Sequence, residues 1–190
     1  MFAGFSGYVE DKGSYTLIKT PSNPGYHWGN YIVFDRAPVS GDLNRWKSVF
    51  DREFVYYQEP HHYVFTWDTE SDEKGVIDEF LEAGFEFDSA VVLTAKKLKK
   101  PPHFNNEIRI EKIKSDQQWE GVIKLQTLCS DPKYVNEYYE DFKRSQVHQY
   151  RKMAEAGRGD WFGAFVDDRL VGDLGVYFEG GIARYQNVGT

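Results

Sequence analysis

The chain has 190 residues, 41% of them hydrophobic, and a formal net charge of -7 at pH 7. This acidic balance excludes the broad basic surface that binding to nucleic-acid phosphates requires. The single cysteine, Cys129, excludes an internal disulfide and is typical of a reducing compartment. No apolar run approaches the ~20 residues of a membrane-spanning helix. A cytoplasmic protein with no nucleic-acid and no membrane partner is therefore expected.

The first 98 residues have the pattern of alternating strands and helices. Two short strands are expected in "YTLIKT" and "YIVFDRAP", followed by a helix over 40–54. Apolar residues recur there every three or four positions, at Leu43, Trp46, Phe50 and Phe54, and so share one helical face. Ser40 or Asp42 can cap the start of this helix.

Three further elements complete this first half. A strand rich in aromatic residues is expected in "HHYVFTWD", and a helix over 71–84 follows, capped by Ser71 and ended by Gly84. The run "FEFDSAVVLTA", residues 85–95, is expected to be a long strand. A linker over 99–106 is indicated by clustered lysines, prolines and asparagines.

The second half, residues 107–190, begins with a strand in "EIRIEKI" and a helix that starts at a capping box of Ser115 and Gln118. A longer helix is expected over 137–156, ended by Gly157. Three strands follow, in "WFGAFV", "RLVGDLGVYF" and "IARYQNV". The turns between them, at residues 167–168 and 180–181, are short enough to predict antiparallel neighbours.

This order, with "GDWFGAFVDDRLVGDLGVYF" and "GGIARYQNVGT", resembles the opening of the GCN5-related N-acetyltransferase (GNAT) fold. The first half, ending in "FLEAGFEFDSAVVLTA", looks like the closing half of such a domain. "NPGYHWGNYIVFD" and "RYQNVGT" resemble signatures of a bacterial group with a degenerate N-terminal GNAT-like lobe. The resemblance implies a mixed α+β fold built from two half-domains. Its sheet would be mainly antiparallel, with helices on both faces.

The resemblance also implies a function, the transfer of an acetyl group from acetyl-CoA to a primary amine on a small molecule or peptide. The backbone of Asn187, Val188, Gly189 and Thr190 would then run beside the pantetheine arm. A loop that grips the coenzyme A diphosphate would follow the fourth strand, so the chain is expected to stop just before it. The sequence therefore predicts an incomplete or inactive acetyltransferase. A non-catalytic GNAT-like module that binds a ligand or partner is the alternative.

The catalytic residues are less clearly indicated. Relatives often carry a glutamate at the position of Gly189, so Glu179 and Asp173 are the remaining candidates for the base. The alternative for each, an exposed strand or turn acid, is the commoner role of such residues. Tyr185 can face an acceptor or belong to the core. No metal site is predicted, because adjacent residues such as His61 and His62 point to opposite faces of a strand. Cys129 is expected to be a small buried hydrophobe.

An uncovered last strand also raises the question of what shelters it. One hypothesis is that both halves close a single sheet, in permuted order or by exchange between chains. A homodimer through the exposed strand is predicted on the same grounds, since an open strand edge invites pairing.

Overall fold

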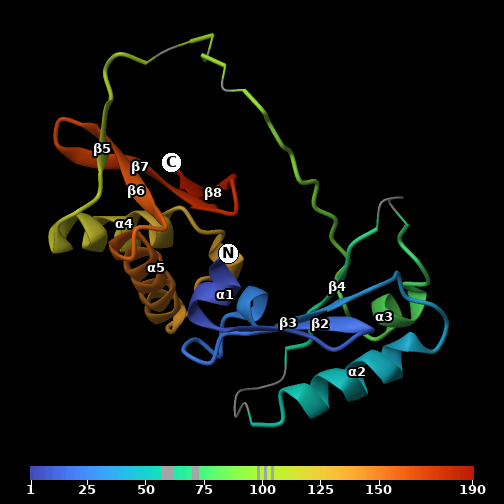
Figure 1. Ribbon diagram of the computed structural model, residues 1–190. Helices are drawn as coiled ribbons and strands as arrows, with labels where there is room; N and C mark the ends of the chain where they lie inside the picture. Colours follow the sequence, from blue (N-terminus) through green and yellow to red (C-terminus); the bar gives the residue numbers. More distant parts are fainter. Residues whose placement is uncertain (57–61, 70–72, 98, 101, 104) are drawn as a thin grey trace. The chain divides into compact units, whose positions relative to one another are not determined.

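The computed structural model describes residues 1–190 except 57–61, 70–72, 98, 101 and 104 (Figure 1). Its contacts fall into two compact units, Phe2–Lys100 and Pro101–Thr190 with Met1. The fold mixes helices with two four-stranded sheets, one in each unit. A single sheet shared by both halves of one chain was expected and is wrong, because no ladder between described strands joins the two sheets.

The N-terminal unit has the strand order β1-β2-β3-β4. The β1–β2 and β2–β3 pairs are antiparallel, whereas β3 and β4 are parallel. Its strands are β1 (Tyr8–Asp11), β2 (Tyr15–Lys19), β3 (Tyr31–Phe34) and β4 (Phe65–Trp67). Its helices are α1 (Phe2–Ser6), the 3-10 turn η1 (His27–Gly29), α2 (Asp42–Glu53) and α3 (Asp78–Glu82).

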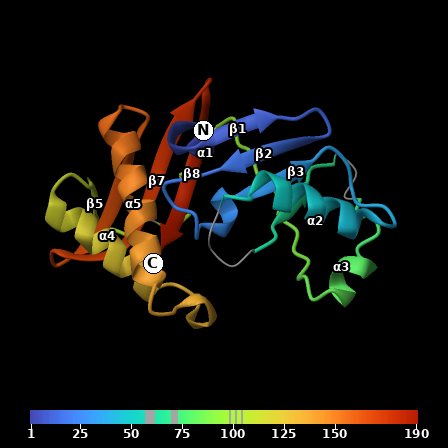
Figure 2. The same ribbon diagram turned by 90° about the horizontal axis from the view of Figure 1, so that it is seen from below.

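The core of this unit is mostly aromatic, and the 40–54 segment packs against it with the helical face that its spacing predicts. Trp46 of α2 is fully buried and stacks on Phe34 of β3, with ring centroids 3.9 Å apart and planes 8° apart. Phe50 and Phe54 follow on the same helical face, and Phe80 of α3 closes the cluster. Figure 2 shows α2 lying along the sheet that supplies the other side of this core.

Two local expectations fail in this unit. The residue that caps α2 is Gly41, in a left-handed conformation, and neither Ser40 nor Asp42 caps the helix with its side chain. Asp42 instead accepts a hydrogen bond from the Val39 amide at 2.9 Å and pairs with two arginines, Arg36 and Arg45. Residues 85–95 form no strand. The predictions for Ser71 and His61 lie outside the described residues.

A buried amide organises the turn before β3. Asn30, fully buried, accepts a hydrogen bond from the Thr20 backbone amide at 2.8 Å. Its own NH₂ group donates to three backbone carbonyls, those of Asn23, Pro24 and Tyr26, at 2.9–3.2 Å. One side chain thereby satisfies four backbone groups in a segment that has no ladder of its own.

The C-terminal unit is antiparallel throughout, in the order β5-β6-β7-β8. The capping box of Ser115 and Gln118 is confirmed at the start of α4. The two short turns are confirmed as well, and all four of their residues have positive φ, as the turns that join twisted strands require. The elements are β5 (Arg109–Lys112), α4 (Asp116–Leu128), η2 (Pro132–Tyr134), α5 (Tyr139–Glu155), β6 (Gly159–Val166), β7 (Arg169–Glu179) and β8 (Ile182–Gly189).

Both long helices of this unit pack on one face of its sheet. Trp161 of β6 meets Trp119 of α4 at 6.1 Å and stacks on Tyr150 of α5 at 4.9 Å between ring centroids. In the described part of this unit, both long helices therefore lie on the same face of the sheet. Among the same residues, no helix has the length and apolar character needed to cross a membrane.

Candidate functional site

The β7–β8 hairpin carries every candidate residue that the sequence singled out. In its register Asp173 lies opposite Gly189, which places this acid beside the 187–190 segment. Glu179 lies opposite Ile182, next to the turn. The two acids are six positions apart along β7, which corresponds to roughly 20 Å. The structure therefore brings Asp173, and not Glu179, to the end of β8.

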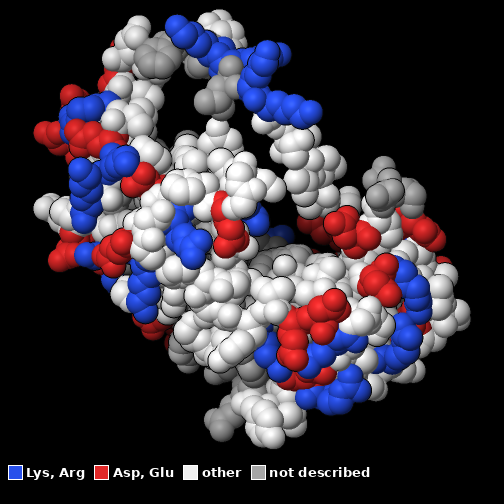
Figure 3. All heavy atoms as spheres, in the orientation of Figure 1, with Lys and Arg blue, Asp and Glu red and all other residues white. Residues whose placement is uncertain are grey.

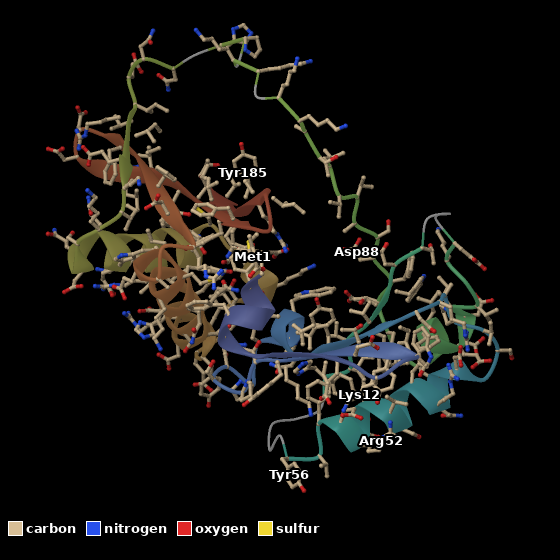
Figure 4. The ribbon with its side chains drawn as sticks, in the orientation of Figure 1. Met1, Lys12, Arg52, Tyr56, Asp88 and Tyr185 are labelled. Atoms are coloured by element: carbon tan, nitrogen blue, oxygen red, sulfur yellow. The ribbon has the colours of Figure 1, made fainter. Side chains whose placement is uncertain are left out.

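Tyr185 lies apart from this cluster. It pairs with Val176, whereas Asp173 shares the helix-covered face with Gly175 and Tyr177. Because neighbouring residues of a strand point to opposite faces, Tyr185 projects away from α4 and α5 (Figure 4). Its side chain is 63% exposed, so it is no part of the core of this unit.

Asp173 is not the exposed strand acid that its sequence context suggests. It is 4% exposed, and its Oδ1 accepts a hydrogen bond from Gln126 Nε2 at 2.9 Å. Its Oδ2 is buried and has no hydrogen-bond partner among the described residues. Burial raises the pKa of this carboxyl to about 6, although the Gln126 hydrogen bond and the charge of Lys143 oppose the rise. Such a group can exchange a proton near neutral pH.

The end of β8 is bulged. Asp173 pairs with Gly189 and Gly175 pairs with Gln186, so two residues of β8, Asn187 and Val188, stand against one residue of β7. Asn187 has a φ of +43°, in the left-handed region that asparagine tolerates better than most residues. The bulge interrupts the regular ladder within the segment 187–190, which the resemblance is expected to place beside the pantetheine arm.

An amide cluster holds the bulge against both helices. We use this name for Gln126 of α4, Gln146 of α5 and the neighbours Gln186 and Asn187 of β8. Asn187 Nδ2 lies 3.2 Å from Gln146 Oε1 and 3.4 Å from Gln126 Oε1. Gln186 Nε2 donates to the Tyr150 hydroxyl at 2.9 Å and to Asn187 Oδ1 at 3.1 Å. Side chains from α4, α5 and β8 thus hold the bulge of β8 in place.

Sequence reasoning missed the helical half of this cluster, although a signal was present. Trp119, Val122 and Ile123 are buried on one face of α4, and Gln126 occupies the next position of the same stripe. On α5, Gln146 lies similarly beside buried Val147. A glutamine in an apolar stripe must find a hydrogen-bond partner inside the protein, and such positions therefore mark a buried polar network.

Cys129 and the neighbouring end of the chain are also placed by this hairpin. Cys129 is the residue that directly follows α4, and it is exposed, contrary to the expectation of a buried thiol. Its Sγ lies 3.3 Å from the carbonyl oxygen of Thr190. The segment 187–190 therefore runs past the end of α4, with Gly189 buried and Thr190 exposed.

A separate groove of about 450 Å³ lies between α4 and α5, and its charges cancel. Arg144 pairs with Glu120 and Glu140, and Arg151 pairs with Asp116 and Glu155. Acidic and basic side chains also alternate over the face seen in Figure 3. The groove has no uncompensated charge for an anion, and the buried carboxyl of Asp173 does not line it.

Comparison with known proteins informs the fold more than the function. No protein-family model matches the chain, and no curated protein sequence matches it. A crystal structure of a conserved protein of unknown function from Staphylococcus epidermidis is similar with a TM-score of 0.68 and 12% identity, over 98% of this chain and 72% of the other. This likeness shows the fold.

A second solved structure is similar over a shorter stretch. It is the PaiA N-acetyltransferase of Thermoplasma acidophilum in complex with coenzyme A, with a TM-score of 0.36 and 17% identity. The match covers 43% of this chain and 57% of the acetyltransferase. The chain thus has a partial structural similarity to an N-acetyltransferase, which is too limited to establish a common fold.

Proposed function

We propose that this chain carries the acyl-transfer end of an acetyl-CoA-dependent N-acetyltransferase, with Asp173 as the proton acceptor. The observation that supports this most directly is the position of Asp173. The resemblance calls for a carboxylate at the position of Gly189, which has no side chain, and Asp173 lies directly across the ladder from it. A Cβ built on Gly189 would lie 3.4 Å from Asp173 Oδ1. The neighbouring strand thus brings a carboxylate to the position that lacks one.

The chemistry assigned to these residues is simple. An uncharged primary amine attacks the carbonyl carbon of the thioester, the C–S bond breaks, and the thiolate of coenzyme A leaves. Asp173 takes the proton that the nitrogen loses. With a pKa of about 6, Asp173 is about nine-tenths ionised at pH 7 and so is available as a base. Its Oδ2, buried and without a hydrogen-bond partner among the described residues, is assigned as the acceptor atom, which the proton reaches through one water.

The bulge supports the other half of the proposal. Two residues of β8 face one residue of β7, so a backbone group there lies outside the regular ladder. A backbone N–H held in this way can donate to the oxygen that gains negative charge when the amine attacks. Gly172 and Gly189, which have no side chains, lie next to each other at this strand end. The diphosphate of coenzyme A is assigned by the resemblance to a loop that follows β8, so the proposal concerns the acyl end only.

The test is binding and turnover with acetyl-CoA itself. Isothermal titration should show heat on adding acetyl-CoA, and release of the coenzyme A thiol should follow when a panel of primary amines is supplied. Asp173→Asn should slow release by about 100-fold or more, in the range measured for removal of a general base. Glu179→Gln should change it less than about twofold, since this acid is remote from the bulge.

Two outcomes would count against this function. Absence of heat at millimolar acetyl-CoA would favour the alternative, a non-catalytic module that binds another ligand or partner. Turnover that Asp173→Asn leaves intact would keep the transferase and remove Asp173 from its mechanism. The acceptor, a small-molecule or peptide amine, is part of the proposal and is identified by the same panel.

A further inference from the structure

The segment 88–97 leaves the N-terminal unit as an exposed extended chain. Up to Phe87 the chain is held against the sheet, because this ring stacks on Trp67 of β4 at 5.9 Å and lies 5.5 Å from Lys74 Nζ. From Asp88, labelled in Figure 4, every residue to Lys97 is exposed. Figure 1 draws this part of the chain as a trace with no helix or strand of its own.

Its composition does not fit a solvated linker. Val91, Val92 and Leu93 are 84%, 85% and 90% exposed, the most exposed run of large apolar side chains in the described chain. The β-branched residues Val91, Val92 and Thr94 favour strands, as the sequence predicts for this stretch. Within the described chain, no backbone hydrogen bond joins residues 88–97 to another segment. An apolar strand with an unpaired backbone is a site that pairs with another strand.

We propose that this segment pairs with the same segment of a second copy of the chain. The strands would run antiparallel, with the two-fold axis at Val92. Val92 then faces its own counterpart, and Val91 faces Leu93 of the other copy on the opposite side of the ribbon. All three exposed apolar residues would thus lie opposite apolar residues, which is the arrangement that stabilises paired strands.

The charges of the segment favour this partner and this direction. Acidic Glu86 and Asp88 precede the apolar run, and basic Lys96 and Lys97 follow it. In the antiparallel register centred on Val92, Asp88 lies opposite Lys96 of the other copy. The two-fold axis makes two such ion pairs, one at each end of the paired segment. A parallel pair would instead place like charges side by side, which is destabilising. The lysine-rich end of the segment is visible as a run of blue in Figure 3.

The inference is independent of the acetyl-transfer proposal, and its test is the oligomeric state. Sedimentation velocity from about 1 µM to about 1 mM should show a monomer–dimer equilibrium, because a small interface of two strands gives weak association. The association should weaken with added salt, since the two ion pairs are exposed. A chain that remains monomeric at the highest concentration would overturn the proposal.

Variants of the charged pair test the register. Lys96→Glu places acids opposite each other at both ends and should weaken the dimer about tenfold or more, and Val92→Lys should do the same. The double variant Asp88→Lys with Lys96→Asp restores both pairs and should return the dissociation constant to within about threefold of the wild type. A double variant as weak as Lys96→Glu would exclude this register.

Cross-linking gives a second, geometric readout. In a chain whose Cys129 is changed to serine, Val92→Cys should form a disulfide-linked dimer on oxidation, because directly opposed residues have a suitable Cα separation. The matched control Ser89→Cys should not, because the two copies of residue 89 would lie roughly 20 Å apart. Tyr185→Lys, on exposed strand β8, should leave the dimer unchanged. If Tyr185→Lys abolishes the dimer instead, β8 is the contact and the proposal is wrong.

Discussion

Asp173 and Gly189 face each other across the last ladder of the C-terminal sheet, and a Cβ at position 189 would lie in van der Waals contact with the carboxyl group, 3.4 Å from its Oδ1. The buried acid is thus enclosed by backbone on one side and by the amide cluster on the other. It makes one hydrogen bond where its two oxygens could accept several. A buried carboxylate with so few hydrogen bonds destabilises the folded chain when it is ionised, and protonation removes this cost.

The first prediction concerns stability. The pKa of Asp173 is about 6 in the folded chain against an ordinary value of 3.8, so folding favours the protonated form. Stability from this group is fully present below pH ~4 and is lost, by about 2–3 kcal/mol, as the pH rises through 6. Asp173→Asn cannot ionise and should therefore gain about 1–2 kcal/mol at pH 7.5, with no gain at pH 4.

Urea unfolding at the two pH values measures this difference. Asp167→Asn is the matched control, because Asp167 occupies an exposed turn with positive φ, a conformation that asparagine also accepts. It should change the free energy of unfolding by less than about 0.5 kcal/mol at both pH values. Equal gains for both variants would show that burial of Asp173 is not the cause.

The second prediction concerns the pH dependence of acetyl transfer. Asp173 must be ionised to accept a proton, so the rate at saturating acetyl-CoA, divided by the fraction of the amine that is uncharged at each pH, should rise with pH through about 6 and then level off. Lys143→Met removes a positive charge that lowers the pKa of Asp173, so the midpoint should move to higher pH. A midpoint that stays fixed in Lys143→Met would argue against Asp173 as the titrating group.

The third prediction concerns the bulge. Asn187 combines a left-handed backbone with a side chain bonded to both helices. Asn187→Gly keeps the backbone conformation and loses the bonds, so we expect a loss of about 1–2 kcal/mol. Asn187→Ala loses the bonds and adds strain of about 1–2 kcal/mol. Amide hydrogen exchange at Val188 should speed up in both variants, and more in the alanine variant.

Comparing the stability of Asn187→Gly with that of Asn187→Ala separates the effect of the positive φ from the effect of the lost side-chain hydrogen bonds. If alanine and glycine at position 187 were equally tolerated, the positive φ would not be a constraint. If neither variant changed exchange at Val188, the side-chain bonds of Asn187 would not hold the bulge. Far-UV circular dichroism confirms in each case that the helices of the C-terminal unit remain folded.

The fourth prediction concerns the amide that organises the turn before β3. Asn30→Asp keeps the acceptor for the Thr20 amide but replaces the NH₂ donor, which serves three carbonyls, with an oxygen. Buried and facing carbonyls, this new carboxyl should have a raised pKa and destabilise the unit by about 3 kcal/mol or more at pH 7. The loss should shrink as the pH falls and the carboxyl gains a proton.

Asn136→Asp is the control for this change. Asn136 is exposed, and its Oδ1 accepts a hydrogen bond from the Tyr138 amide, which an aspartate can equally do. Thermal unfolding at pH 7 and pH 4 should therefore show a pH-dependent loss in Asn30→Asp and almost none in Asn136→Asp. Similar losses in both would mean that the buried donor is not what matters at position 30.

Local sequence signals predicted the C-terminal unit well. The capping box at Ser115, the turn at residues 167–168 and the end of α5 at Gly157 depend on residues that are neighbours in the chain, and all three are confirmed. The strand β1 was missed, because Tyr8–Asp11 is short, exposed and without alternation. Only pairing with β2 identifies it as a strand.

The predictions that failed concern features that depend on contacts between residues distant in the sequence. Residues 85–95 have a strand-forming composition, but a strand also needs a partner, and none of the described strands supplies one. The candidate site shows the same limit. Asp173 could be named from the sequence, whereas its burial under Gln126 depends on a helix 47 residues earlier in the chain.

The aromatic cores give each unit its own optical reporter. Trp46 is fully buried in the N-terminal unit, and Trp161 is 1% exposed in the C-terminal unit. Chains that retain one or the other tryptophan would therefore follow the melting of each unit through its own fluorescence. Coincident curves would reveal one cooperative folding unit, whereas separate midpoints would reveal two modules that fold autonomously.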